Sequence, residues 1–165
     1  DILFDFANIP FYVYLMFFSF IYVGLSQRKT RQVSQKKAIF IPFLLIFLSI
    51  YAILFDFGIS FVPIFSWFLA ISLVFIINTF IKSEKDVYYC LDSKVFTIEG
   101  SNLPLFMMML LFFTKYFVGV MFLNELPIIN TTLFVAISSF LYGIFTGMYL
   151  LRFFILINKL RKIKN

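Results

Sequence analysis

Five long apolar runs set the strongest limit on what this chain can fold into. They span Ile9 to Leu25, Ala38 to Phe55, Phe61 to Ile81, Leu103 to Leu123 and Leu133 to Ile157. A helix rises about 1.5 Å per residue, so each run is long enough to cross about 30 Å of hydrocarbon. Composition agrees, because 62% of the residues are hydrophobic and only 13% are charged. We therefore predict that residues 1–165 form a single membrane domain.

The residues at the starts of these runs favour helices. Cap residues and early-turn prolines recur there, namely Asn8 with Pro10, Ser60 with Pro63, Asn102 with Pro104, and Asn130 or Thr131 after Pro127. The second helix is expected to begin further back, with Ser34 as its cap, so that Pro42 falls inside it and bends it. The predicted fold class is an all-α membrane protein, a bundle of five transmembrane helices.

The basic residues predict how the bundle is oriented. All of them except Lys115 fall on one side: Arg28, Lys29, Arg31, Lys36 and Lys37 after the first span, Lys82, Lys85 and Lys94 after the third, and Arg152, Lys159, Arg161, Lys162 and Lys164 at the end. The opposite side carries Asp1, Asp5, Asp56 and Glu125. By the positive-inside rule, the amino terminus lies outside and the carboxyl terminus lies in the cytoplasm.

The net charge of +6 raises the question of the partner. Nucleic acid is not expected, because the basic residues are spread over loops beside the membrane without a recognisable binding fold. Anionic lipid headgroups are the simpler partner, since basic residues near the membrane surface gain roughly 1 kcal/mol each from acidic lipids. We assign headgroup contact to the five basic residues between the first and second spans, Arg28, Lys29, Arg31, Lys36 and Lys37.

One stretch between the third and fourth spans reads as a β-hairpin. In DVYYCLDSKVFTIEG, Asp86 to Gly100, two β-branched and aromatic runs flank the turn residues Asp92, Ser93 and Lys94. Val87, Tyr89 and Leu91 would share one face. An isolated hairpin is marginal in water, so this one must lean on the membrane surface, other loops or a partner. It is either a cap on the cytoplasmic end of the bundle or a docking element.

The residue inventory restricts the chemistry. The chain has no histidine and a single cysteine, Cys90. This composition removes the commonest metal ligand, the usual general base and any disulfide or dithiol pair within one chain. No glycine-rich phosphate loop is present. We predict no metal and no cofactor, and a role other than that of an enzyme is favoured.

Lys115 is the residue that these patterns leave unexplained. It lies in LLFFTKYFVGVMF, well inside the fourth span. A lysine at the centre of a transmembrane helix costs about 2.5–3.5 kcal/mol, so it should face the bundle interior, be paired or lose its proton. The nearest carboxylates, Asp56 and Glu125, lie at the outer ends of spans. Lys115 should therefore depend on neutral acceptors at its own depth.

Span five offers such acceptors beside a face of small residues. Ser139, Gly143 and Gly147 recur every fourth position, and Gly119 follows Lys115 by four. Small residues let helices approach closely, so we predict that these two faces pack together within one chain, a dimer contact being the alternative. The predicted intramembrane polar site comprises Lys115, Tyr142, Thr146 and Ser49, with Tyr142 or Thr146 accepting from the amine.

Four segments in this order resemble a known family: GLSQRKTRQVSQKKAIFIPF, VFTIEGSNLPL, FFTKYFVGV and SSFLYGIFTG. From about Ile9 to Arg152 the chain is similar to an uncharacterised family of small bacterial inner-membrane proteins that is known only as a domain of unknown function. The resemblance implies a multi-pass protein of the bacterial inner membrane. It implies no activity.

Two classes of function remain. The first is an accessory or scaffold subunit that packs against a larger inner-membrane complex, or against copies of itself. The second is a small carrier or channel in which Lys115 binds an anionic or protonatable substrate within the bilayer. Co-purification of a stoichiometric partner would favour the first class, and solute flux that depends on Lys115 would favour the second.

Overall fold

A computed structural model of the chain describes residues 11–81, 87–90 and 92–164. Its elements are α1 (Phe11–Ser26), β1 (Arg31–Ser34), α2 (Gln35–Phe57), α3 (Phe61–Ile81), β2 (Val87–Cys90), β3 (Val95–Ile98), α4 (Leu103–Leu123), the 3₁₀ helix η3 (Pro127–Asn130) and α5 (Thr132–Lys164). The predicted start of the first span at Ile9, with its cap residues Asn8 and Pro10, lies outside the described residues, as do Asp86 and Leu91 of the predicted hairpin.

The helices agree with most of the predicted spans. α2, α3, α4 and α5 are each long and apolar enough to span a membrane, and α1 is a shorter apolar helix over its described part. These helices indicate a multi-pass membrane protein. α3 and α4 begin and end at the predicted residues, and α2 begins at Gln35 behind Ser34 with Pro42 inside it. The helix of the predicted fifth span extends beyond Ile157, because α5 continues to Lys164.

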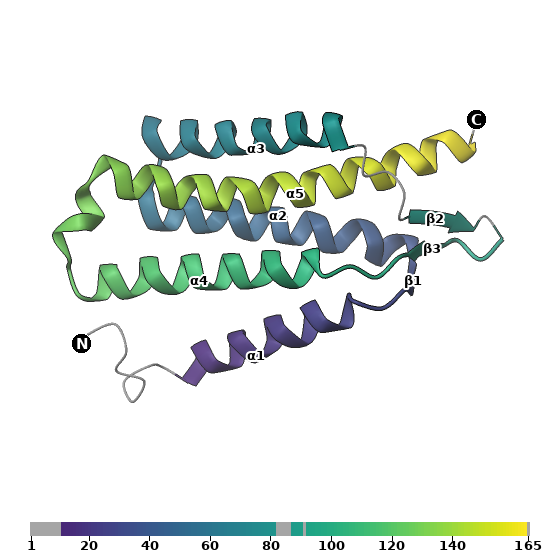
Figure 1. Cartoon of the computed structure of the whole chain (residues 1–165), viewed down its shortest axis with the longest axis horizontal. Helices are drawn as coiled ribbons and strands as arrows, with labels where there is room; N and C mark the ends of the chain where they lie inside the picture. Colours follow the sequence, from purple (N-terminus) through teal and green to yellow (C-terminus); the bar gives the residue numbers. More distant parts are fainter. Residues whose placement is uncertain (1–10, 82–86, 91, 165) are drawn as a thin grey trace.

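α5 is the central helix of the bundle. It packs against α2, α3 and α4, while α1 lies at the rim against α4 (Figure 1). Tyr142 and Phe145 of α5 have no exposed surface, in keeping with this position. The contact between α1 and α4 is largely aromatic, with the ring centroids of Phe17 and Phe112 5.1 Å apart. Helix α5 therefore contributes side chains to every site that lies between α2, α3 and α4.

A three-stranded sheet closes one end of the bundle, with strand order β1-β3-β2 and both pairs antiparallel (Figure 1). The predicted hairpin is confirmed as β2 and β3, in which Cys90 lies opposite Val95. Strand β1 was not predicted, because we read the basic segment between the first two spans as a loop. It pairs with β3, where Arg31 lies opposite Ile98. A four-residue strand whose partner is far away in sequence carries too little local signal to be recognised.

The sheet rests on parts of the chain itself. Phe96 and Ile98 of β3 pack with Leu156 of α5 and Ala38 of α2 in one buried cluster. The Lys159 ammonium of α5 also donates a hydrogen bond to the carbonyl oxygen of Val87. The long carboxyl-terminal part of α5 therefore supplies the support that the hairpin needs.

Candidate functional site

Lys115 forms an ion pair with Asp56. Its Nζ donates to Oδ1 of Asp56 at 2.5 Å, and the Tyr142 hydroxyl donates to Oδ2 of the same carboxylate at 3.0 Å. The Asp56 side chain is only 7% exposed, whereas that of Lys115 is 38% exposed. The Lys115 ammonium also lies 5.6 Å from the centroid of the Phe55 ring. This one carboxylate therefore joins α2, α4 and α5.

The prediction that Lys115 depends on neutral acceptors is wrong, because its partner is Asp56. Asp56 is the second-last residue of α2, and Cβ bonds tilt toward the start of a helix, so its side chain leans back into the bundle. α5 runs in the opposite direction, and Tyr142 leans the other way to meet it. Placing Asp56 at the outer end of its span ignored the backward tilt of its side chain and therefore put its carboxylate too far out.

A second layer of hydrogen bonds continues from Tyr142. Oγ of Ser49 and Oγ1 of Thr146 share a hydrogen bond of 2.6 Å, and Ser49 also donates to the backbone carbonyl of Tyr142 at 3.2 Å. The indole Nε1 of Trp67 donates to Thr146 Oγ1 at 3.1 Å. The four predicted polar residues thus lie in one connected set together with Asp56 and Trp67, which we call the Asp56 network. Sequence reasoning missed Trp67, although it is the single tryptophan of the chain.

The small residues of α5 face α3 and not α4, which corrects the predicted packing. A Cβ on Gly143 would lie 2.5 Å from the carbonyl oxygen of Trp67, and one on Gly147 would lie 3.0 Å from Cβ of Val74. A Cβ on Gly119 would have no neighbour within 4 Å. Ser139 is fully buried on α5, and its hydroxyl has no hydrogen-bond partner within the described part of the chain. Small residues indicate that some helix comes close, but they do not identify which one.

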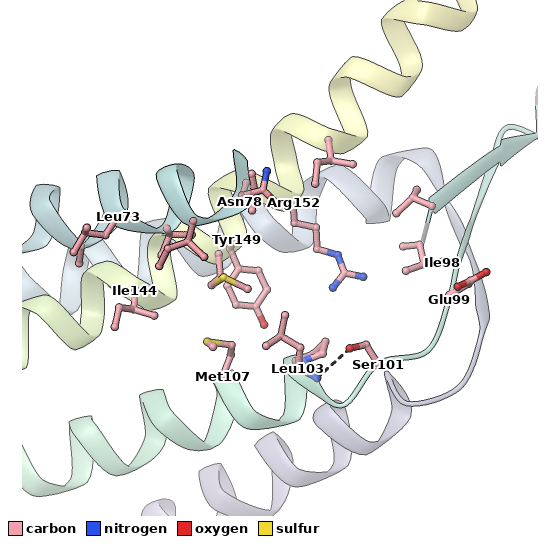
Figure 2. Close-up of a pocket in the computed structure, with 18 of the residues that line it drawn as sticks. Leu73, Asn78, Ile98, Glu99, Ser101, Leu103, Met107, Ile144, Tyr149 and Arg152 are labelled. Carbon is pink, nitrogen blue, oxygen red and sulfur yellow. Dashed lines mark hydrogen bonds between the residues drawn. The ribbon is translucent and has the colours of Figure 1, made fainter. Parts of the chain in front are cut away.

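A second polar cluster lies near the sheet, beside a cavity of about 620 Å³ (Figure 2). We call this cavity the Arg152 groove. Its walls are mostly apolar and come from three helices: Leu73, Val74 and Ile77 from α3, Ile144 and Met148 from α5, and Leu103 and Met107 from α4. The guanidinium of Arg152 and the hydroxyl of Tyr149 both point into it (Figure 2).

Two polar groups of the Arg152 groove, the Tyr149 hydroxyl and the Arg152 guanidinium, lack hydrogen-bond partners within the described residues. Tyr149 is 5% exposed, and its hydroxyl has no hydrogen bond in the described structure. Arg152 makes no ion pair or hydrogen bond with the described residues. Arg31 of β1 lies near the Arg152 guanidinium. Burial and, second, the positive charge of Arg152 lower the pKa of Arg31. Sequence reasoning placed Arg152 among the cytoplasmic basic residues and did not use its position inside the predicted fifth span.

The residues predicted to contact headgroups occupy two different environments. Arg28, Lys29, Lys36 and Lys37 are exposed near the sheet end of the bundle. Arg31 is half-buried, and one of its guanidinium nitrogens donates to Oε1 of Gln27 at 3.0 Å. The four exposed residues can reach a headgroup layer, while Arg31 belongs to the polar surroundings of the Arg152 groove.

Comparison with curated proteins and with solved structures gave no match. A family model, by contrast, matches residues 3–164. The matched range contains both the Asp56 network and the Arg152 groove, and it confirms the resemblance to an uncharacterised family. The chain belongs to DUF6622, a family of unknown function.

Proposed function

We propose that this protein is an accessory or scaffold subunit that packs against a larger complex in the bacterial inner membrane. The Asp56 network supports this proposal, because its charges and hydroxyls are already satisfied by one another. A charge that serves catalysis or transport has to be available to a substrate, whereas a paired one holds helices together. The Asp56 network is therefore best suited to fixing the positions of α2, α4 and α5 relative to one another.

The same proposal places the sheet end in the cytoplasm and the amino terminus outside. The exposed basic residues Arg28, Lys29, Lys36 and Lys37 gather at the sheet end, and Asp56 and Glu125 mark the opposite end. This asymmetry is the distribution that the positive-inside rule describes. The exposed residues at the sheet end would then contact anionic headgroups of the inner leaflet.

A photocrosslinking scan tests the accessory role. One crosslinkable residue at a time replaces Phe18 of α1, Phe47 of α2, Phe68 of α3 or Phe113 of α4, each of which is well exposed on the bundle. An accessory subunit should give a discrete crosslinked protein at the positions on one face, with stoichiometric recovery in gentle detergent. The positions on the other faces serve as the matched controls. Crosslinks to lipid alone at all four positions would exclude a stable protein partner.

The alternative is a small carrier that uses Lys115. One observation favours it, namely that the Lys115 side chain is 38% exposed while its partner Asp56 is nearly buried. An anionic substrate could reach the ammonium only by competing with that carboxylate. Purified protein in liposomes decides the matter: flux that is lost in Lys115→Met and kept in Lys94→Met, an exposed lysine of the hairpin turn, would establish the carrier. The absence of flux in the wild type would reject it.

A further inference from the structure

The Arg152 groove opens on the surface of the bundle between α3 and α4. Among its lining residues, Leu73 is 40% exposed, Ile77 is 52% exposed and Leu103 is 45% exposed. Its volume of about 620 Å³ lies within the range of about 300–1,000 Å³ that is usual for small-molecule sites. At its sheet end the apolar wall gives way to polar groups. The groove is thus apolar along the helices and cationic at one end.

Three features make the polar end a site for an anion. The Arg152 guanidinium points into the groove and forms no ion pair with a carboxylate of the described residues, and the carboxylate of Glu99, which also lines the groove, points away from it (Figure 2). The buried Tyr149 hydroxyl is unpaired in the described structure. The start of α4 borders the groove at Leu103 and Pro104, and its first turn has no acidic residue. Helix starts favour negative charge, and an unpaired buried hydroxyl or guanidinium is costly.

We propose that the Arg152 groove binds one anionic phospholipid. The Arg152 guanidinium and the Tyr149 hydroxyl donate to the phosphate oxygens, and one acyl chain lies along the apolar wall formed by α3, α4 and α5. Arginine suits this role because its planar donors match phosphate geometry. Basic pockets between transmembrane helices are known to bind the headgroups of anionic lipids.

The apolar wall selects a lipid over a soluble anion. A free phosphate would use only the polar end and would leave Met107, Ile144 and Met148 facing empty space. A lipid with a zwitterionic headgroup would fill the wall but would bring no net charge to Arg152. Only an amphiphile that carries both an acyl chain and a headgroup with a net negative charge fits both ends of the groove.

Native mass spectrometry of the purified protein tests this proposal. The protein is titrated in neutral detergent with dioleoyl phosphatidylglycerol, with dioleoyl phosphatidylcholine, or with inorganic phosphate alone. We expect one tightly bound phosphatidylglycerol, at least about tenfold weaker binding of phosphatidylcholine, and no competition from excess phosphate. Equal affinity for the two lipids, or displacement of the lipid by inorganic phosphate, would overturn the proposal.

Variants at the polar end supply the first control. Arg152→Gln should weaken phosphatidylglycerol binding about tenfold or more, and Arg152→Lys should restore part of it. Arg161→Gln removes the same charge from an exposed position on the same helix and should leave binding unchanged. Equal losses in Arg152→Gln and Arg161→Gln would mean that the lipid responds to overall charge and not to the groove.

Variants at the apolar wall keep Arg152 and block the space that the acyl chain of the lipid would occupy. Ile77→Trp places a large side chain at a lining position, whereas Ile76→Trp does so at the adjacent position, which does not line the groove. The two residues are almost equally exposed, at 52% and 51%. We expect lipid binding to be lost in Ile77→Trp only. Binding that survives Ile77→Trp would reject the groove as the site, even if Arg152→Gln fails to fold.

Discussion

The bundle contains two polar clusters that differ in whether their charged groups and hydroxyls have partners within the protein. In the Asp56 network, the Lys115 ammonium, the carboxylate and the Tyr142 hydroxyl are all satisfied by protein atoms. At the Arg152 groove, a guanidinium and a buried hydroxyl have no hydrogen-bond partner within the described residues. The polar groups of the Asp56 network are paired with one another and need no ligand to offset the cost of their burial. The unpaired groups at the Arg152 groove are the reason for proposing a ligand there.

The comparison reverses the order in which the sequence ranks Lys115 and Arg152 as candidates for ligand binding. Lys115 stands out because it interrupts an apolar run, but its charge is balanced by Asp56 of α2, whose carboxylate also accepts from Tyr142 of α5. Arg152 is not conspicuous in the sequence because it precedes a basic tail, yet its guanidinium points into the groove and forms no ion pair with the described residues. Lys115, the residue with the more unusual local sequence, is therefore paired within the bundle, and Arg152 is the better candidate for binding a ligand.

The largest expected effect is at the Lys115 and Asp56 pair. Lys115→Met leaves a nearly buried carboxylate without its cation, so we expect the free energy of unfolding in detergent to fall by about 3 kcal/mol. Adding Asp56→Leu should restore most of that loss, because the double variant leaves no charge unpaired. Denaturant titration of the two single variants and the double variant measures the coupling. Additive losses, or a stability gain in Lys115→Met alone, would contradict the description of this cluster as a stabilising network.

The second-largest effect is a difference in stability between alanine variants of Gly143 and Gly119, the glycines of the two predicted packing faces. Gly143→Ala pushes a methyl group against the carbonyl oxygen of Trp67 and Cβ of Ala70, so it should destabilise the protein by about 2 kcal/mol. Gly119→Ala meets no atom within 4 Å and should be neutral or stabilising by up to about 1 kcal/mol, since alanine favours helix. Thermal unfolding of both variants under one condition provides the measurement. Similar destabilisation of both would mean that α4 also needs a small residue at its surface.

A smaller effect of the opposite sign is expected at the Arg152 groove. Arg152→Met removes an unpaired charge, so in neutral detergent it should raise the free energy of unfolding by about 1 kcal/mol. Added phosphatidylglycerol should stabilise the wild type and leave this variant unchanged, because only a ligand-binding native state gains from ligand. Unfolding curves with and without the lipid test both parts. A loss of stability in neutral detergent would place Arg152 with Lys115 as a structural charge.

The smallest effect is a shift in the reactivity of the Cys90 thiol, and labelling of this thiol also tests on which side of the membrane the sheet lies. The Ser93 side chain and, second, the backbone groups of Ser93 and Asp92 lower the pKa of the Cys90 thiol. Its thiolate is therefore present at lower pH than that of an ordinary thiol, and Ser93→Ala should shift the pH profile of maleimide labelling upward. A membrane-impermeant maleimide should label inverted vesicles and not intact cells. Labelling of intact cells would place the sheet outside and reverse the proposed orientation.

Much of the fold was accessible from sequence because hydrophobic length and turn chemistry are local signals. The apolar runs gave both ends of α3 and α4 correctly, and the Asp92 to Lys94 turn located the hairpin. The apolar run did not indicate how far α5 continues, because Lys159, Arg161 and Lys162 follow the apolar residues. A helix can carry those charges once it leaves the hydrocarbon, and here the sheet packs against that projecting part.

The sites were less accessible because they depend on relations between helices. The polar residues on span five were identified, but the pairing of Lys115 on α4 with Asp56 on α2 depends on the backward tilt of the Asp56 side chain and on how these two helices are placed beside α5. The GxxxG pattern in α5 predicted a close approach and not its partner α3. The Arg152 groove exists only when α3, α4 and α5 are assembled. No single segment carries the information that defines it.

The central position of β3 in the sheet constrains the order of events during synthesis. β1 leaves the ribosome early, between α1 and α2, but its strand partner β3 is made only after α3 has been completed. At roughly 5–20 residues per second, the nascent strand waits for several seconds with its edge unpaired. The sheet that joins the two halves of the polypeptide can thus form only after α1, α2 and α3 have been synthesised.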